Sequence, residues 1–203
     1  EFQYRDYDVE RERISATLGL DFRAGDSTEL YVRGIYSQFD DQEFRRRLTF
    51  DLGDAGVSGT SDQLVYDDDE AIVVERDVKD RFESQKIRSV VLGGESDWGD
   101  WFAEYSGSWA KSSERENGSI DPTQFAREYE AEGLRLGFDL ADERVPLYSV
   151  LANPGDFFNP SAYELNDVEY VVLSDSQDEE YSAKFDLGRR FVGDNGEFTV
   201  QAG

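Results

Sequence analysis

Apolar and polar residues alternate strictly over the first well-defined segment of the chain, residues 14–22. Even positions are apolar from Ile14 to Phe22, whereas the odd positions between them are small or polar. A period of two residues is that of a β-strand with one apolar face, and it does not fit a helix. The alternation resumes at residues 29–36 after a polar turn at residues 23–28, so the two segments predict a β-hairpin.

The same pattern recurs along the chain and predicts an all-β, antiparallel up-and-down meander of about eight long strands. Their centres are expected near Leu18, Val32, Val90, Tyr105, Leu136, Tyr148, Phe185 and Val200. Short turns with Gly, Asp or Asn, which suit tight hairpins, are expected at residues 23–28, 95–100, 141–145 and 193–196. Longer connections are expected over residues 40–80, 111–127 and 153–179. Short turns that alternate with long loops are typical of outer-membrane β-barrels.

The alternation also predicts which face of each strand contacts lipid. The apolar sets expected there are Leu30, Val32, Gly34 and Tyr36; Trp101, Ala103, Tyr105, Gly107 and Trp109; Leu134, Leu136, Phe138 and Leu140; Tyr181, Ala183, Phe185 and Leu187; and Phe198, Val200 and Ala202. An arginine or lysine facing lipid at mid-bilayer costs about 2–4 kcal/mol, so Arg33, Arg135 and Lys184 are expected to face the lumen. Beyond the membrane, the strand near Val32 is expected to resume at residues 43–52.

A soluble β-sandwich would show the same alternation, because its strands also place apolar residues inside and polar residues outside. Two features favour a membrane barrel instead. The connections differ in length in an alternating way, and aromatic residues such as Phe22, Trp98, Trp101 and Phe102 lie near strand ends. Aromatic girdles of this kind mark the two interfaces of a membrane barrel.

Composition narrows the possible functions. The 203-residue chain has no Cys and no His, and its 46 Asp and Glu exceed its 21 Lys and Arg, for a formal net charge of −25. The sequence thus excludes thiolate, disulfide and histidine chemistry, and its acidity argues against a nucleic-acid partner. An aromatic content of 14% argues against disorder. Apolar runs such as residues 71–74 are too short for a membrane-spanning helix of about 20 residues.

Two charged runs are candidate sites. Arg45, Arg46 and Arg47 form a basic cluster, and arginine side chains can hold a carboxylate or phosphate of an anionic ligand at the extracellular mouth. In the alternative interpretation, these arginines bind nearby loop carboxylates or anionic lipid headgroups. The acidic run at residues 67–70 lacks the spacing of a calcium-binding loop and is expected to be a solvated loop.

The sequence offers no arrangement of residues for bond chemistry, so we expect no enzyme activity. It has no histidine base for a catalytic triad and no nucleophile elbow. It also has no glycine-rich phosphate loop, and nothing selects one carboxylate pair for glycosidase chemistry. No catalytic residue, cofactor or metal site is therefore predicted.

Several segments, taken in order, resemble the barrel region of TonB-dependent receptors, the active outer-membrane transporters of Gram-negative bacteria. The segments that carry the resemblance are residues 28–37, 42–47, 136–142 with Val145 and Pro146, 159–163 and 183–191. The resemblance spans nearly the whole chain but includes neither a plug nor a C-terminal strand with a terminal aromatic residue. Residues 1–203 are therefore expected to be one partial barrel domain, truncated at both ends.

The resemblance implies a 22-stranded transmembrane β-barrel that is closed by a plug. It implies uptake of a scarce nutrient, such as siderophore-bound iron, cobalamin or a saccharide, energised by the TonB complex through an N-terminal region that is absent here. The other implied partners are outer-membrane lipid and the nutrient itself. Within this segment, the candidate ligand contacts are lumen-side Arg33 and loop-side Arg45, Arg46 and Arg47.

Two alternatives remain at this point. The chain could be a self-contained small outer-membrane barrel that acts as an anchor or adhesin, or a soluble acidic β-sandwich that binds a ligand. A closed ring of eight strands would favour the small barrel. A segment of a larger barrel would instead form an open meander with two edge strands.

Overall fold

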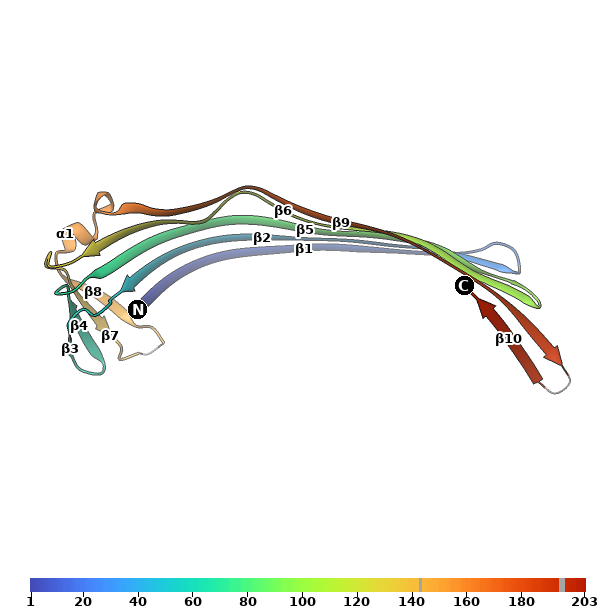
Figure 1. Cartoon of the computed structure of the whole chain (residues 1–203), viewed down its shortest axis with the longest axis horizontal. Coiled ribbons are helices and arrows are strands. Elements are labelled where there is room, and N and C mark those ends of the chain that lie inside the picture. The colour runs from blue at the N-terminus through green and yellow to red at the C-terminus, as the bar shows by residue number, and fades with distance from the viewer. Residues whose placement is uncertain (143, 194–195) are drawn as a thin grey trace. The chain divides into compact units, whose positions relative to one another are not determined.

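The computed structural model describes residues 1–142, 144–193 and 196–203, and within them the chain is all-β (Figure 1). Its strands are β1 (Phe2–Arg23), β2 (Thr28–Asp51), β3 (Val57–Gly59), β4 (Gln63–Asp67), β5 (Ile72–Trp98), β6 (Trp101–Tyr129), β7 (Arg135–Asp139), β8 (Leu147–Ala152), β9 (Glu164–Gly193) and β10 (Gly196–Ala202). A short helix, α1 (Pro154–Phe157), and a 3-10 turn (Pro160–Ala162) precede β9. No helix among the described residues is long and apolar enough to cross a membrane.

The strands form two sheets. One has six strands in the order β1-β2-β5-β6-β9-β10, and the other has four in the order β3-β4-β7-β8. The six-stranded sheet is a meander of long antiparallel strands, as the sequence predicts, because its neighbours follow chain order once the small-sheet strands are set aside. Strands β1 and β10 are its two edges, so the described strands do not close into a barrel.

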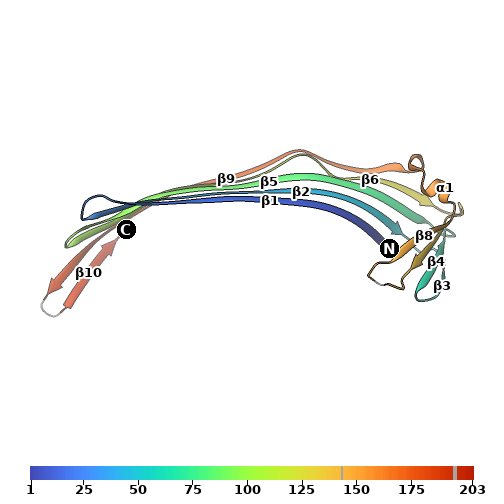
Figure 2. The same cartoon turned by 180° about the vertical axis from the view of Figure 1, so that it is seen from behind.

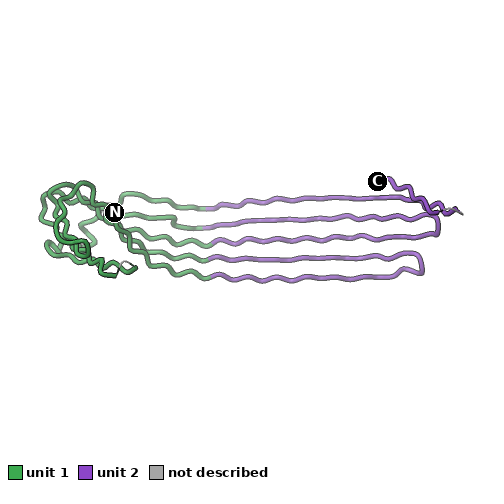
Figure 3. The backbone as a smooth tube through the Cα atoms, turned by 90° about the horizontal axis from the view of Figure 1, so that it is seen from below, with its two compact units in different colours: residues 1–10, 42–82, 118–172 green, residues 11–41, 83–117, 173–203 purple. Residues whose placement is uncertain are grey.

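The residues of the chain group into two compact units, which are coloured separately in Figure 3. Unit 1 comprises residues 1–10, 42–82 and 118–172, and unit 2 comprises residues 11–41, 83–117 and 173–203. The long strands are divided between these two units, and each unit is described by itself below.

Unit 2 consists of strand segments joined by tight turns. Strands β1 and β2 are joined at residues 24–27, and β5 and β6 at residues 99–100. Gly25 and Gly99 adopt a φ of 79° in these turns, a backbone conformation that disfavours residues with a side chain. The turns predicted at residues 23–28 and 95–100 are therefore confirmed, the second being shorter than expected. Residues 194 and 195, at the centre of the turn predicted at 193–196, lie outside the described residues.

Unit 1 contains the small sheet and a hydrophobic core, and in both views β3, β4, β7 and β8 lie together near α1 (Figures 1 and 2). The core combines residues of the long strands with residues of the small sheet and of α1. Its fully buried members are Phe50, Ile72, Val74, Tyr129, Leu134, Leu136, Phe138 and Phe157. The Phe50 ring lies 5.4 Å from that of Phe138 in an edge-to-face contact and 6.0 Å from that of Phe157 in a stacked one. Aromatic side chains thus supply a large share of the buried apolar surface of this unit.

The predicted strands around Leu136 and Tyr148 exist, but their place in the fold corrects the prediction. They are β7 and β8, which are short strands of the small sheet rather than members of the meander. Leu134, Leu136 and Phe138 are consequently buried in the core of unit 1 and do not form a lipid-facing surface. The alternation is real, but a period of two does not reveal what covers the apolar face. Residue 143, in the turn predicted at 141–145, lies outside the described residues.

The predicted long connections are also corrected. Residues 111–127 belong entirely to β6, and β9 begins at Glu164 within the expected loop at 153–179. The expected loop at 40–80 contains the end of β2, both β3 and β4, and the start of β5. In residues 111–127 the composition resembles that of a loop, because polar and charged side chains occupy both faces of the strand.

Two neighbouring phenylalanines test the core of unit 1. Phe157 is 0% exposed, and its ring lies 5.0 Å from the guanidinium carbon of Arg76, whereas Phe158 is 59% exposed. We expect Phe157→Ala to lower the free energy of unfolding by about 3–5 kcal/mol, because it leaves a cavity in a packed core. The matched variant Phe158→Ala should cost much less. Thermal unfolding followed by circular dichroism measures both, and equal losses would contradict this packing.

Candidate functional site

One face of the sheet in unit 2 carries a continuous set of apolar side chains, which we call the apolar band. Its larger members are Ile14, Leu18, Leu20, Phe22, Leu30, Val32, Tyr36, Val90, Leu92, Trp101, Tyr105, Trp109, Tyr181, Phe185, Leu187, Phe198 and Val200. Contacts between strands confirm the shared face. The Ser96 hydroxyl lies 3.3 Å from the Tyr105 hydroxyl, and the Phe191 and Phe198 rings lie 6.1 Å apart. Apart from Leu134–Leu140, the predicted apolar sets thus lie together on one face.

The apolar band is exposed, although it consists of large hydrophobic side chains. Leu18 and Leu20 are each 56% exposed, and Phe185 is 59% exposed. Soluble monomers rarely expose a contiguous apolar surface of this extent, so such a surface indicates contact with a protein or a membrane. No described part of unit 2 covers it.

The apolar band ends abruptly along each strand. The next residues on the same face are Glu12 on β1, Gln38 on β2, Arg88 on β5, Lys111 on β6 and Glu179 on β9. On β6 the band runs from Trp101 to Trp109, a span of nine residues. A tilted membrane-spanning strand needs about 9–11 residues. Tyr36, Trp109 and Tyr181 border the band at this end, and the Trp109 indole donates a hydrogen bond of 2.6 Å to Glu179.

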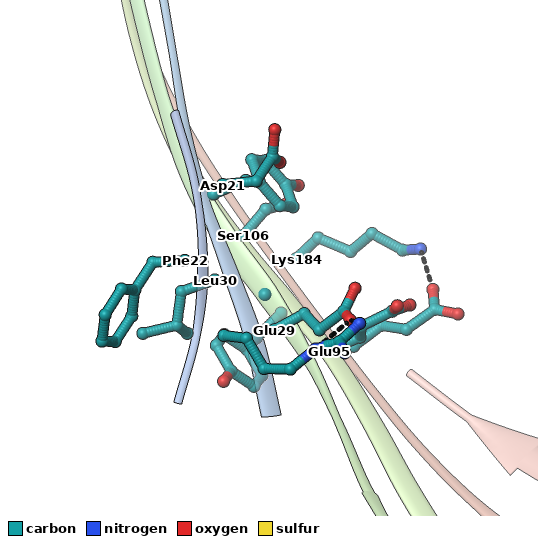
Figure 4. A pocket seen from close by; sticks show the side chains of 12 residues that line it. Asp21, Phe22, Glu29, Leu30, Glu95, Ser106 and Lys184 are labelled. Carbon is teal, nitrogen blue, oxygen red and sulfur yellow. Dashed lines mark hydrogen bonds and ion pairs between the residues drawn. The ribbon is translucent and has the colours of Figure 1, made fainter. Parts of the chain in front are cut away.

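The opposite face of unit 2 is polar and contains a hollow of about 590 Å³. Charged side chains from five strands line it. Figure 4 shows four of them, Asp21, Glu29, Glu95 and Lys184, while Phe22 and Leu30 point away to the other side. The Lys184 ammonium lies 2.6 Å from Asp186 and 3.5 Å from Glu104. Lys184 is therefore paired with carboxylates both along its own strand and across to β6.

Arg33 lies on this polar face, as the sequence predicts. Its guanidinium pairs with Asp21 at 2.5 Å, donates to the Leu20 carbonyl at 2.9 Å and lies 5.1 Å from the centre of the Tyr31 ring. Lys184 shares the face. Arg135 does not, because it belongs to β7 in unit 1, where it pairs with Asp67 at 3.0 Å.

The three consecutive arginines of β2 separate onto two faces in unit 1. Arg45 and Arg47 both reach Asp77 of β5, at 3.0 and 2.5 Å, and the Asp77 carboxylate is fully buried between them. Arg46 points to the other face and pairs with Asp6 at 2.5 Å, with both side chains well exposed. The structure therefore does not bring the three arginines together as one cluster.

Burial and ion pairing have opposite effects on the pKa of Arg45. Burial by itself lowers the pKa of its guanidinium, but hydrogen bonds and charge interactions with Tyr7 and Asp77 outweigh that effect, so the pKa is raised. Arg45 therefore remains charged at any physiological pH. Its neighbour along the strand, Glu43, accepts ion pairs from Lys79 and Arg81, and Lys79 also reaches Asp121 at 2.9 Å.

Asp77 is the residue of this arrangement that sequence reasoning missed. Its position two residues before Lys79 and four before Arg81 places all three on one face of a strand. That face complements Glu43, Arg45 and Arg47, but complementary charges identify partners only when the register between strands is known. The register became evident only from the fold.

The acidic run at residues 67–70 is only in part the solvated loop that the sequence predicts, because Asp67 belongs to β4 and Asp68 is buried. The Asp68 carboxylate accepts the Glu132 backbone N–H at 2.8 Å, and the Asp69 carboxylate accepts the Gly56 N–H at 2.6 Å. These carboxylates hold adjacent loops in the way that turn-forming aspartates do. Among the residues that the structure describes, no group of three or more His, Cys, Asp or Glu is placed to hold a metal ion.

Comparison with models of known protein families, with curated proteins and with solved structures gives no significant match in any of the three.

The Asp77 pairing can be tested against a surface pair in the same unit. We expect Asp77→Asn to lower the free energy of unfolding by about 3–5 kcal/mol, because it leaves two largely buried guanidinium groups without a counter-charge. Asp6→Asn removes the partner of exposed Arg46 and should cost only about 0–1 kcal/mol. Denaturant titration of both variants measures the difference, and a small effect of Asp77→Asn would refute the buried pairing.

Proposed function

We propose that this chain is a segment of an outer-membrane active transporter of a Gram-negative bacterium, of the TonB-dependent receptor type. In this proposal the long strands are neighbouring strands in the wall of a 22-stranded barrel, whose lumen is occupied by a plug. The observation that carries the proposal is the exposed apolar band, because its width along β6 matches a membrane-spanning strand and aromatic side chains border it.

The two faces of unit 2 support the same arrangement. The apolar band would contact lipid, and the polar face with Arg33, Lys184 and Glu104 would face the lumen. An arginine or lysine facing lipid at mid-bilayer costs about 2–4 kcal/mol, whereas charges in a polar lumen are readily accommodated. An open meander with two edge strands also fits a barrel segment better than a closed small barrel.

The connections of unequal length support an orientation. In barrels of this class the short turns face the periplasm and the longer connections face the outside. The turns after β1 and β5 are short, whereas the connections from β2 to β5 and from β6 to β9 contain further strands and α1. These longer connections would take part in capturing the nutrient, which the family resemblance places among siderophore-bound iron, cobalamin and saccharides.

The four candidate ligand-binding arginines differ in how accessible their guanidinium groups are and in which carboxylates already pair with them. Arg45 and Arg47 are held by Asp77, and Arg33 is held by Asp21. Arg46 is the most accessible of the four, because both members of its ion pair are well exposed. In the proposed mechanism the loops and the plug bind the nutrient, and TonB then displaces the plug without any bond chemistry.

Tryptophan fluorescence tests the membrane placement directly. Trp98, Trp101 and Trp109 all lie on the face of the apolar band. In vesicles of brominated lipid we expect strong quenching of a variant that keeps Trp109 alone. A matched variant with Tyr31→Trp as its only tryptophan should be little quenched, since Tyr31 lies on the polar face. Equal protection of both from the brominated lipid would favour the soluble β-sandwich and refute the proposal.

Growth experiments test the transport function. We expect a strain that lacks the gene for this protein to lose uptake of one scarce nutrient, and to lose no more when TonB is deleted as well. Reintroduction of the gene should restore uptake, and Arg46→Gln should weaken uptake at limiting nutrient if Arg46 contacts the ligand. Unchanged uptake of iron chelates, cobalamin and saccharides in the deletion strain would count against a transporter.

A further inference from the structure

A cluster of basic side chains lies on the same face of unit 2 as the apolar band. Lys86 and Arg88 of β5 and Lys111 and Arg115 of β6 line a hollow of about 220 Å³ together with Ser84 and Ser113. The two strands are neighbours in the sheet. Because side chains two apart share a face, Arg88 continues the line of Val90 and Leu92, and Lys111 continues the line of Trp109. We call these four cations the β5–β6 basic patch.

Three of the four cations of this patch have no carboxylate partner among the residues that the structure describes. Elsewhere, most arginines and lysines pair with carboxylates, as Arg33 does with Asp21 and Arg190 does with Asp97. Lys86, Arg88 and Arg115 form no ion pair with any carboxylate of the described residues. Three free cations side by side are notable in a chain with a net charge of −25, where carboxylates are abundant.

The acidic groups near the patch are engaged with other partners. Asp175 lines the hollow and accepts a hydrogen bond of 2.8 Å from Gln177. Glu179 accepts hydrogen bonds from Trp109 and Tyr181, which together with Lys111 lower its pKa. Lys111 therefore has the Glu179 carboxylate nearby, whereas the other three cations have no carboxylate partner among the described residues.

The position of the patch indicates its ligand. The patch begins two residues beyond Val90 and Trp109, where the apolar band ends. This is a distance of about 7 Å along each strand. If the band contacts the acyl chains, Arg88 and Lys111, the cations nearest the band, lie at the depth of the lipid headgroups. Arginine binds phosphate through paired N–H groups, lysine binds it as a point charge, and the two serines add hydroxyl donors.

We propose that the β5–β6 basic patch binds the phosphate groups of an anionic lipid headgroup on the outside of the barrel. This inference rests on the proposed membrane placement of the apolar band. A free phosphate ion presents the same chemistry, but the patch adjoins an apolar surface on the same face, which a lipid would contact at the same time. Binding would fix the depth of the segment in the membrane.

The test uses the purified protein in neutral detergent, titrated with phosphatidylglycerol or phosphatidylcholine and examined by native mass spectrometry. The patch variant combines Lys86→Gln, Arg88→Gln, Lys111→Gln and Arg115→Gln. The matched control removes four cations from the opposite, polar face of unit 2, with Arg13→Gln, Arg23→Gln, Lys184→Gln and Arg190→Gln. We expect the patch variant to bind phosphatidylglycerol at least about tenfold more weakly, since each cation near a membrane surface contributes roughly fivefold. The control should retain most of the affinity.

Each outcome bears on the inference. Equal losses in both variants would overturn it, because they would reflect net charge rather than a site. If inorganic phosphate displaces phosphatidylglycerol and binds with equal affinity, the lipid-binding inference is also overturned. The patch would then be a site for a free anion. If the fourfold variant does not fold, the pair Lys111→Gln and Arg115→Gln should still weaken binding at least about fivefold, and an unchanged affinity would refute the patch.

The quenching experiment in vesicles of brominated lipid separates this inference from the proposed function. Quenching of Trp109 by brominated phosphatidylcholine reports insertion and does not involve an anionic headgroup. Insertion without patch-dependent phosphatidylglycerol binding refutes only the lipid site. Absence of quenching refutes the membrane placement and the lipid site with it.

Discussion

The alternation of side chains across the β-pleat is the constraint on which the rest of this structure depends. Each long strand presents one set of residues to each face, so a run such as Ile14 to Phe22 commits its apolar members to one side. In unit 2 the neighbouring strands all place their apolar side chains on the same face of the sheet. This arrangement produces the apolar band on one face and the polar face on the other. Strands with so little buried apolar surface depend on their ladder of backbone hydrogen bonds and on whatever covers the band.

In unit 1 the same pleat produces a conventional interior. The small sheet and α1 cover the apolar ends of long strands, and Phe50, Phe138 and Phe157 meet in the core. Charged residues are also buried here, and the Asp77 carboxylate forms ion pairs with both Arg45 and Arg47. A basic run that suggests ligand binding in the sequence therefore includes two arginines with a structural role, and Arg46 remains as the accessible one.

Much of the fold was predictable from residues close in sequence. The turns at Gly25 and Gly99, the strand character around Leu18, Val32, Val90, Tyr105 and Phe185, and the placement of Arg33 on the polar face all follow from local patterns. The small sheet was not predictable in the same way, since β4 pairs with β7 across a long stretch of chain and alternation does not specify partners. Residues 111–127 were mistaken for a loop because both of their faces are polar.

The sequence by itself determined that the chain forms two-faced strands, that it lacks histidine and cysteine chemistry, and which residues share a face within each strand. Only the tertiary structure decided which strands are neighbours, and therefore that Leu136 is buried while Leu18 is exposed. It likewise brought Lys86 and Arg88 next to Lys111 and Arg115, which lie on different strands. The physical reason is that the pleat sets orientation locally, whereas burial and charge pairing depend on register between strands distant in sequence.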